Sequence, residues 1–505
     1  MTQNVYDDVT PEELGKKLYK CADAIRDAVD EARYKNYILP LVFLKSIDDT
    51  FSDRLEENKE QFAGDDELAR KAITGMSVPE DYRWEDITER SENIAPYLDE
   101  AFDALEREND RLRGVVRVTY SDEEALNDQM LRDLIQRIDT FELSTEKVEK
   151  DFLGEAYMYM VGEFAKDEGK EGGQFFTPTD VIDLMVRLLA KTGETDGFEK
   201  GASFHDPTAG SAGFLVHAAS YFRNVQGGDP STWTVTGQEL NADIASIAQV
   251  NTFMHGLEAE IRREDSLSNP QFPGYLEDGE GFDYVLANFP FSADWAKSEL
   301  GDDKWNRFNW TSKLPRSNRA DYAFIMHIAE LLNDEGKAIV VVPRGVLFRT
   351  NEKAFRKPMI EKDILEAVIG LPSNLFQSVS LPSALLVLNR DKEQERKKQI
   401  QFIDAADETF YEEKSNHNDI TPTGRDSIIS LFADWTTKDR TSRVVTHDEI
   451  RANEYNLTLS LYIEPEDPIG PIDVDQEIEE FRGLQTELDA ARARLDNHLE
   501  VLDYE

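Results

Sequence analysis

The sequence predicts an α/β fold with helical segments before and after it, and three observations support this prediction. From Gly172 onward, short apolar runs alternate with stretches of helical periodicity, as in a sheet built from strand–helix units. Ahead of that region, apolar residues recur at helical spacing over residues 14–29. Behind it, the same kind of spacing returns over residues 478–502.

Length and composition indicate a protein of several domains. A chain of 505 residues with 40% hydrophobic residues can form about two to four domains with real cores. No apolar run of about 18 residues is present, and the N-terminus is not a signal peptide. The single Cys21 and seven scattered His argue against disulfides and against a metal site. We therefore expect a soluble, cytoplasmic protein that has no membrane partner.

The charge is strongly acidic. The chain carries 102 Asp and Glu against 56 Lys and Arg, a formal net charge of −46, and the acids are spread along its whole length. A salt-adapted origin explains this best, because salt screens self-repulsion while acidic side chains keep the surface hydrated. Taken by itself, the charge argues against a nucleic acid as partner.

Residues 1–150 are expected to form a helical domain. Two charged helical patterns cover 95–113 and 123–138, and the apolar block 37–44 contains Pro40, which we place near a helix start or at a kink. A clear amphipathic stripe opens the domain, at Leu14, Leu18, Cys21, Ile25 and Val29. Because no catalytic constellation is present here, we interpret the domain as a bundle that packs against another part of the protein.

The predicted sheet follows a helix over 151–164 and a loop over 167–173. Its helices are expected at 180–190, from Phe214, at 242–255 and at 321–333. Thr177 or Thr179 would cap the first of these, with Pro178 in its first turn. Its strands are expected at 202–206, 233–237, 261–264 (a poor candidate), 283–287, 337–342, 364–371 and 384–389.

Small and polar residues follow the first three strands. Residues 207–213, rich in Gly, Ala and Ser, connect a strand to a helix, and such a loop lets the backbone approach a ligand at a helix N-terminus. Glu239 ends the second strand, where an acid commonly binds ribose hydroxyls. Asp265 follows the third strand. A Gly-rich turn alone is weak support, because many such turns have no ligand.

The fourth strand ends on Asn288, followed by Phe289, Pro290 and Phe291. An amide at the carboxyl end of a parallel strand lies where open α/β sheets bind ligands. Beside it stand two aromatic rings and a proline that stiffens the turn. This arrangement suits a flat ring that bears an amine: the amide oxygen accepts a hydrogen bond, a backbone carbonyl accepts a second, and a ring stacks on the face. The alternative is a strand that ends in a proline turn with buried phenylalanines.

Charged residues 391–399 indicate a boundary, and the last stretch reads as a coiled-coil-like helix. Its apolar residues recur at alternating three- and four-residue steps: Ile478, Phe481, Leu484, Leu488, Ala491, Leu495, Leu499 and Leu502. The helix either seeks a partner helix or folds back on its own chain.

Five motifs in one order carry a resemblance to a known family. They are Gln-Phe-Phe-Thr-Pro at 174–178, Asp-Pro-x-x-Gly-Ser-x-Gly-Phe at 206–214, Gly-Gln-Glu at 237–239, Asp-Ser-Leu at 265–267 and Asn-x-Pro-Phe at 288–291. This order resembles the modification subunit of type I restriction–modification systems, which are S-adenosylmethionine-dependent adenine-N6 DNA methyltransferases. Stretches 34–45, 151–157 and 371–376 look similar as well, so the resemblance covers nearly the whole chain.

The resemblance implies a Rossmann-like S-adenosylmethionine methyltransferase sheet and a division into four parts. These are an N-terminal helical domain over 1–150, the methyltransferase domain over 151–392, a C-terminal extension over 393–470 and a coiled-coil-like helix over 471–505.

The resemblance also implies the site residues. The catalytic motif falls on Asn288, Phe289, Pro290 and Phe291, and Asp265 would meet the adenine ring of the cofactor. The contacts to S-adenosylmethionine fall on Gln174, Phe175, Phe176, Thr177, Pro178, Thr179, Asp206, Pro207, Gly210, Ser211, Ala212, Gly213, Glu239 and Asp265.

The chain departs from the family pattern at two positions. Phe289 stands where the family usually has proline; its backbone carbonyl is retained, but the fixed φ of proline is lost, so preorganisation is in doubt. Ala212 stands where a glycine is common, a change that costs little unless the residue needs a positive φ. Neither departure removes a side chain that does chemistry.

In the reaction that the resemblance implies, a flipped adenine in double-stranded DNA receives the methyl group. Sequence reading would belong to a separate specificity subunit, with a second copy of this chain and possible further assembly with a restriction subunit. The chain itself would clamp the DNA through a local basic groove. Arg316 and Arg319 are candidates for that groove, or else ordinary surface arginines.

Three rival interpretations stay open. The substrate could be another planar amide or amine, such as a protein glutamine, although the long helical ends favour DNA. A solitary methyltransferase is disfavoured because no recognition domain of that size follows the sheet. A catalytically weak DNA clamp is the non-enzyme rival, and activity with and without a specificity subunit would separate these cases.

Overall fold

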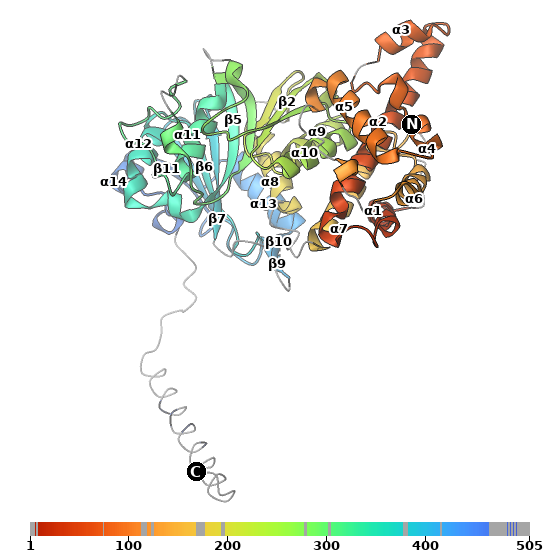
Figure 1. Cartoon of the computed structure of the whole chain (residues 1–505). Coiled ribbons are helices and arrows are strands. Elements are labelled where there is room, and N and C mark those ends of the chain that lie inside the picture. The colour runs from red at the N-terminus through yellow and green to blue at the C-terminus, as the bar shows by residue number, and fades with distance from the viewer. Residues whose placement is uncertain are drawn as a thin grey trace, which may run out of the picture. The chain divides into compact units, whose positions relative to one another are not determined.

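A computed structural model gives the fold (Figure 1). It divides into two compact units, residues 1–463 and 464–505. The described residues are 6 and 9–463, without 74, 113–118, 123–125, 168–176, 193–196, 277–279, 301–302, 304, 377–381 and 415–416, together with 482, 485, 488 and 491. Most of the coiled-coil prediction therefore lies outside the described residues.

The N-terminal part is helical, as predicted. Its helices are α1 (Pro11–Tyr19), α2 (Tyr34–Gln61), α3 (Asp66–Lys71), α4 (Trp84–Glu89), α5 (Ile94–Glu108), α6 (Asp128–Asp139) and α7 (Lys150–Asp167). The stripe over 14–29 is buried throughout, but helix α1 ends at Tyr19 and a 3₁₀ turn over Lys20–Ala24 follows it. Pro40 lies inside α2, close to its first turn.

The bundle packs against the sheet domain through α10 (Ala242–Met254). Ile244, Ile247, Val250 and Met254 of α10 belong to the same buried apolar cluster as the residues of α1, α2 and α7. Figure 1 shows the N-terminal helices, coloured red to orange, gathered beside α10. The expectation of a bundle that packs on another part of the protein is confirmed.

A nine-stranded sheet in the order β11-β8-β6-β7-β5-β4-β1-β2-β3 forms the centre of the larger unit. Its strands are β1 (Ser203–Asp206), β2 (Thr234–Glu239), β3 (Ala259–Arg263), β4 (Phe282–Asn288), β5 (Leu332–Pro343), β6 (Leu365–Gly370), β7 (Ser383–Asn389), β8 (Gln399–Asp404) and β11 (Ser442–Thr446). β7 runs antiparallel to β5 and β6, and β11 runs antiparallel to β8. The other neighbours are parallel.

All seven predicted strands are present, including the third, which the sequence supported poorly. β8 and β11 lie beyond the predicted sheet and extend it after the charged stretch 391–399, and β9 (Tyr411–Glu413) and β10 (Asn418–Ile420) form a separate hairpin. The structure thus gives one continuous sheet up to residue 446. The division of the chain into four parts stays a prediction.

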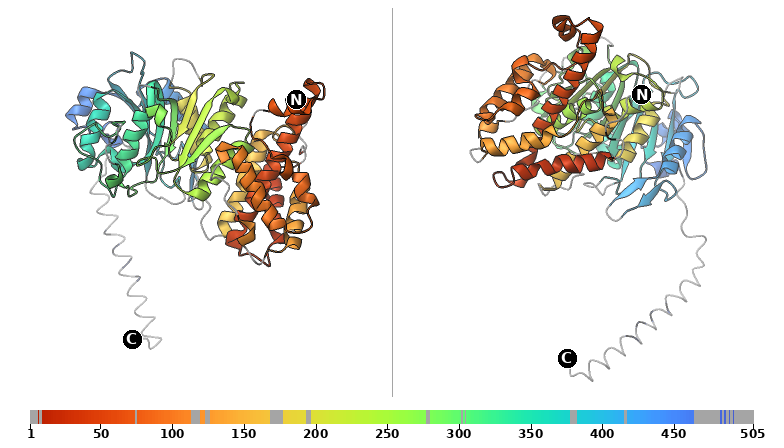
Figure 2. Two further views of the ribbon diagram at one scale, coloured as in Figure 1. Left: turned by 45° about the horizontal axis from the view of Figure 1, so that its top comes forward. Right: turned by 90° about the vertical axis from the view of Figure 1, so that its right-hand side faces the viewer.

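Both faces of the sheet are covered by helices (Figure 2). Tyr284 and Leu286 of β4 pack with α8 (Thr179–Leu189), α9 (Gly213–Asn224) and α13 (Pro422–Ala433). Val285 and Ala287 point the other way and pack with α11 (Asp321–Leu331) and α12 (Lys353–Glu361). Burial on two faces explains why the central strands read as continuous apolar runs. The last helix of the unit is α14 (His447–Ala452).

The predicted threonine cap of α8 is wrong. The helix begins at Thr179, and its N-cap position is Pro178, which has no side chain that could form a cap hydrogen bond. The Thr177 hydroxyl instead accepts a hydrogen bond from the side chain of Asn288. Within the described part of the chain, no helix is long and apolar enough to cross a membrane.

Candidate functional site

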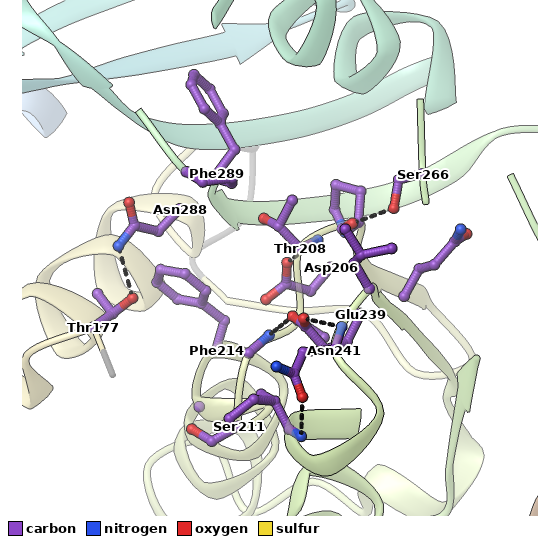
Figure 3. A pocket seen from close by; sticks show the side chains of 18 of the residues that line it. Thr177, Asp206, Thr208, Ser211, Phe214, Glu239, Asn241, Ser266, Asn288 and Phe289 are labelled. Atoms are coloured by element: carbon purple, nitrogen blue, oxygen red, sulfur yellow. Dashed lines mark hydrogen bonds between the residues drawn. The ribbon is translucent and has the colours of Figure 1, made fainter. Parts of the chain in front are cut away.

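A cavity of about 480 Å³ opens at the carboxyl ends of β1, β2 and β4 (Figure 3). These strands are parallel neighbours, so the residues that follow them meet at one edge of the sheet. The cavity brings together most of the predicted site residues: Thr177, Asp206, Pro207, Gly210, Ser211, Gly213, Glu239, Asp265, Asn288, Phe289, Pro290 and Phe291.

The remaining predicted residues lie elsewhere. Pro178 and Thr179 line a neighbouring cavity of about 1230 Å³, which shares Thr177 with the first. Ala212 is fully buried and does not line either cavity. Gln174, Phe175 and Phe176 lie outside the described residues.

The loop between β1 and α9 forms one wall with its backbone. Gly210 has φ +51° and Ala212 has φ +64°, both in the left-handed region. Ala212 therefore needs the positive φ that glycine adopts freely, at a cost of about 1 kcal/mol. A Cβ on Gly213 would come within 2.9 Å of Ile182 Cδ1, so a larger residue there would displace the end of that side chain.

Glu239 ties this loop to the end of β2. Its Oε2 accepts a hydrogen bond from the Gly210 N–H at 3.0 Å, and its Oε1 accepts one from the Asn241 N–H at 2.8 Å. Burial raises the pKa of Glu239. The Glu239 carboxylate thus links the loop between β1 and α9 to the residues after β2. Since a carboxylate accepts about four hydrogen bonds, it can also accept hydrogen bonds from a ligand.

Asp206 lies fully buried at the base of the cavity. Its Oδ1 accepts a hydrogen bond from the Thr208 N–H at 2.9 Å, whereas its Oδ2 is buried and has no partner within the described residues. Burial, aided by the nearby Glu239, raises the pKa of Asp206 to about 8. A buried oxygen without a hydrogen-bond partner lowers the stability of the fold unless a ligand supplies a donor.

The Asp206 carboxyl predicts a dependence of stability on pH. The folded chain keeps it protonated up to about pH 8, whereas the unfolded chain ionises it near pH 3.9. Between these values the folded chain binds more protons, so the free energy of unfolding falls as the pH rises through that window. Asp206→Asn, which has the same shape, is expected to flatten this slope in urea unfolding measured at constant salt. A slope identical to that of the wild type would contradict the assignment.

Asp265 stands in a turn that a buried arginine holds in place. The Asp265 Oδ1 accepts from the Leu267 N–H at 2.8 Å, which closes the turn. Arg307, whose side chain is 1% exposed, donates to the carbonyls of Ser266 and Leu267 at 3.1 and 2.9 Å. Its Nε donates to Asp303 at 2.9 Å. Arg307 was not predicted from the sequence, because nothing in a loop-rich stretch identifies the turn that it supports.

Arg307→Met is expected to lower the free energy of unfolding by about 3 kcal/mol, because it leaves the Asp303 carboxylate and two carbonyls without their buried partner. Arg307→Lys is the matched control. It retains a positive charge for Asp303 but cannot reach both carbonyls, so the loss should be about half as large. Urea unfolding measures both variants, and equal stability of Arg307→Met and wild type would rule out this role.

Asn288 lines the cavity with its side-chain amide. Its Nδ2 donates to the Thr177 hydroxyl at 3.0 Å, and Figure 3 shows the oxygen pointing away from Thr177. No hydrogen bond to that oxygen is formed by any described residue. In this orientation the bond to Thr177 uses the amide nitrogen and leaves the oxygen free to accept.

The aromatic residues after Asn288 have separate positions. The Phe289 ring is buried and stacks on Phe324, with ring centroids 5.0 Å apart. Phe291 is half-buried and meets Phe376 edge-on at 6.3 Å. Phe291 and Phe376 therefore form an apolar part of the cavity wall that Asn288 also lines. Phe376 belongs to the stretch 371–376, which is part of the resemblance described above. Its position in the cavity could not be predicted from the sequence.

The site combines hydrogen-bond acceptors with apolar faces. The acceptors are the Asn288 oxygen and the carboxyls of Asp206, Glu239 and Asp265, and the faces include Phe214, Phe291 and Phe376. Among the described residues, no group of three His, Cys, Asp or Glu is placed to hold a metal ion. The chemistry supported by this set is the binding of a planar, amine-bearing molecule next to a second, polar ligand.

Comparisons with known families cover most of the chain. A family model described as N-6 DNA Methylase matches residues 148–468, and one described as HsdM N-terminal domain matches residues 14–138. The first alone spans more than half of the chain.

Individual proteins agree with the family models. A type I restriction enzyme MjaVII methylase subunit of Methanocaldococcus jannaschii is 30% identical over 94% of this chain and 82% of its own length. The MpnII methylase subunit of Mycoplasma pneumoniae is 27% identical over 94% of both chains. The crystal structure of a type I restriction–modification methyltransferase subunit from Streptococcus thermophilus is 26% identical and has a TM-score of 0.74, covering 90% of this chain and all of that one.

Proposed function

We propose that this chain, which belongs to the N-6 DNA methylase family as a methylase subunit of a type I restriction–modification system, methylates a flipped adenine with S-adenosylmethionine as donor. The observation that carries the proposal is the orientation of Asn288. Its amide nitrogen is engaged by Thr177, which leaves its oxygen free to accept from an amine in the cavity.

The cavity residues fit S-adenosylmethionine. The Gly210–Gly213 backbone would face the methionine part, and the buried Asp206 oxygen without a partner would accept from its ammonium group. Glu239 would accept from the ribose hydroxyls, and Asp265 would meet the adenine ring. When bound, the cofactor supplies an electrophilic methyl group on a sulfonium.

The chain's own residues act on the target amine. The lone pair of an exocyclic adenine amine is delocalised into the ring, which makes the amine a poor nucleophile. Asn288 Oδ1 and the Phe289 carbonyl accept hydrogen bonds from its two N–H groups and draw the nitrogen toward tetrahedral geometry, so that the lone pair becomes available. No strong base is needed, since the extra proton leaves after transfer. The enzyme contributes alignment and preferential binding of the transition state.

The target base has to leave the duplex to reach Asn288. Phe291 lines the cavity from the same turn and would stack on the flipped base, a contact that contributes about 1–3 kcal/mol. The burial of Phe289 against Phe324 compensates for the missing proline of the family motif, because packing instead of ring closure holds the turn.

The partners follow from the subunit's place in such a system. Double-stranded DNA is the substrate, a separate subunit supplies sequence specificity, and a second copy of this chain and a restriction subunit complete the assembly. The net charge of −46 is compatible with this division, because the chain needs only a local basic surface for DNA. A salt-adapted, cytoplasmic origin accounts for the remaining acidic surface.

The test is transfer of a labelled methyl group from S-adenosylmethionine to DNA by the purified full chain, with and without its specificity subunit. Methylated adenine in DNA only when both subunits are present supports the proposal. Transfer to protein instead of DNA would favour a planar amide substrate. DNA binding without any transfer would favour a catalytically weak clamp.

A further inference from the structure

A third cavity, of about 270 Å³ and separate from the site above, is lined by the segment that follows the catalytic motif. Lys313, Arg316 and Arg319 line it, together with Asn351, Glu352 and mostly apolar side chains. Three cations around one cavity are unexpected in a chain with 102 acids and 56 bases. Within the described part of the chain, none of the three forms an ion pair.

Arg319 has a donor that the protein does not use. Its Nε is buried from solvent and has no hydrogen-bond partner among the described residues. A buried N–H group left without an acceptor costs about 1–3 kcal/mol. Glu352 is the nearby acid, but it bonds to Arg349 at 3.3 Å, and burial raises its pKa. Glu352 Oε2 also has no partner among the described residues, but three cations against one acid still leave the cavity wall with an excess of positive charge.

The cavity is joined to the catalytic turn. Ser292, which follows Phe291 with φ +52°, donates its N–H to Asp321 Oδ1 at 2.6 Å. Asp321 is fully buried and its other oxygen accepts from Arg349 at 2.8 Å, while Arg349 reaches Glu352 in the cavity wall. This chain of bonds runs from the end of the catalytic motif to the cavity.

Two further hydrogen bonds join the segment that contains Lys313, Arg316 and Arg319 to the residues that follow the catalytic turn. Trp295 donates its backbone N–H to the Ser317 carbonyl at 2.8 Å and its indole N–H to the Arg316 carbonyl at 2.8 Å. These two bonds fix the backbone at residues 316 and 317 relative to the turn that follows Asn288.

We propose that this cavity binds a phosphodiester of the DNA strand that carries the flipped adenine, with Arg319 and Arg316 as the donors and Lys313 as a supporting charge. The inference rests on the proposed function and deepens it. Arginine forks match phosphate oxygens in pairs, and a lysine acts on phosphate as a point charge. A phosphate held here would place the sugar–phosphate backbone beside the catalytic turn, with the base turned into the cavity that contains Asn288.

The test is the salt dependence of DNA binding by the full chain assembled with its specificity subunit. Arg319→Ala and Arg316→Ala are each expected to reduce the slope of log affinity against log salt by about 0.9, which is the share of the slope that one neutralised phosphate contributes. Arg319→Lys should retain the slope yet bind several-fold more weakly. Lys397→Ala, which removes an exposed lysine on the turn before β8, is the matched control and should leave the slope unchanged.

The outcomes distinguish the phosphate site from the function. Slopes that equal the wild type in both arginine variants, in an assembly that still methylates DNA, would overturn the phosphate site and leave the function standing. A wild-type assembly that neither binds S-adenosylmethionine nor methylates DNA would overturn the function. Binding of inorganic phosphate alone that disappears in Arg319→Ala, with unchanged DNA slopes, would assign the cavity to a free ion and contradict the proposal.

Discussion

Asn288→Ala is expected to lower the rate of methyl transfer by about 10³-fold, while the affinity for S-adenosylmethionine changes little. Asn288 lines the cavity, and in the proposed mechanism its oxygen accepts from the target amine. Loss of one such preorganised group typically costs about 10²–10³ in rate. Most of the proposed cofactor contacts lie on other elements, the loop after β1 and the ends of β2 and β3. Single-turnover methylation and calorimetric titration of the cofactor measure the two quantities separately.

Thr177→Val is the matched control for Asn288. It retains the shape of Thr177 but removes the acceptor that fixes the amide, so the amide can rotate and the rate should fall only about tenfold. If Asn288→Ala retained a rate within a few-fold of the wild type, Asn288 would not be the acceptor for the amine. If Asn288→Ala lost cofactor binding as well, its role would be structural.

Glu239→Ala is expected to weaken S-adenosylmethionine binding by about 100-fold. The variant removes a carboxylate that would accept two ribose hydroxyl hydrogen bonds, each of which contributes about 1.5 kcal/mol when the acceptor is charged. It also releases the N–H groups of Gly210 and Asn241, so the two walls of the cavity lose their common anchor. Calorimetry of the full chain measures the dissociation constant directly.

Glu239→Gln tests the charge separately from the shape. The amide retains one acceptor oxygen but turns an NH₂ group toward one of the two backbone donors, so its affinity should lie between those of the wild type and Glu239→Ala. Urea unfolding of each variant verifies that the fold is intact. A dissociation constant within twofold of the wild type in Glu239→Ala would remove Glu239 from the cofactor site.

Much of the fold could be predicted because the central strands are buried on both faces. Such strands give uninterrupted apolar runs, and β4, β5 and β7 were all placed from them. The position of Asn288 could be predicted for a related reason: a polar residue directly after a buried run has to lie at the end of the strand.

The parts that could not be predicted depend on interactions between distant residues. β8 and β11 follow the charged stretch 391–399 and pair with each other. This pairing leaves no local pattern in the sequence. The end of α1 at Tyr19 is set by packing, since the apolar stripe itself continues to Val29. Arg307 supports the Asp265 turn across about 40 residues, and Thr177 orients Asn288 across 111.

The most direct test of adenine methylation by this chain is sequencing of N6-methyladenine in the genomic DNA of the source organism, with this gene intact and with it deleted. We expect methylation of a two-part target sequence that disappears in the deletion strain and returns when the wild-type gene, but not Asn288→Ala, is restored. An unchanged set of methylated adenine motifs after deletion of an expressed gene would contradict the assignment of this chain as a DNA adenine methyltransferase.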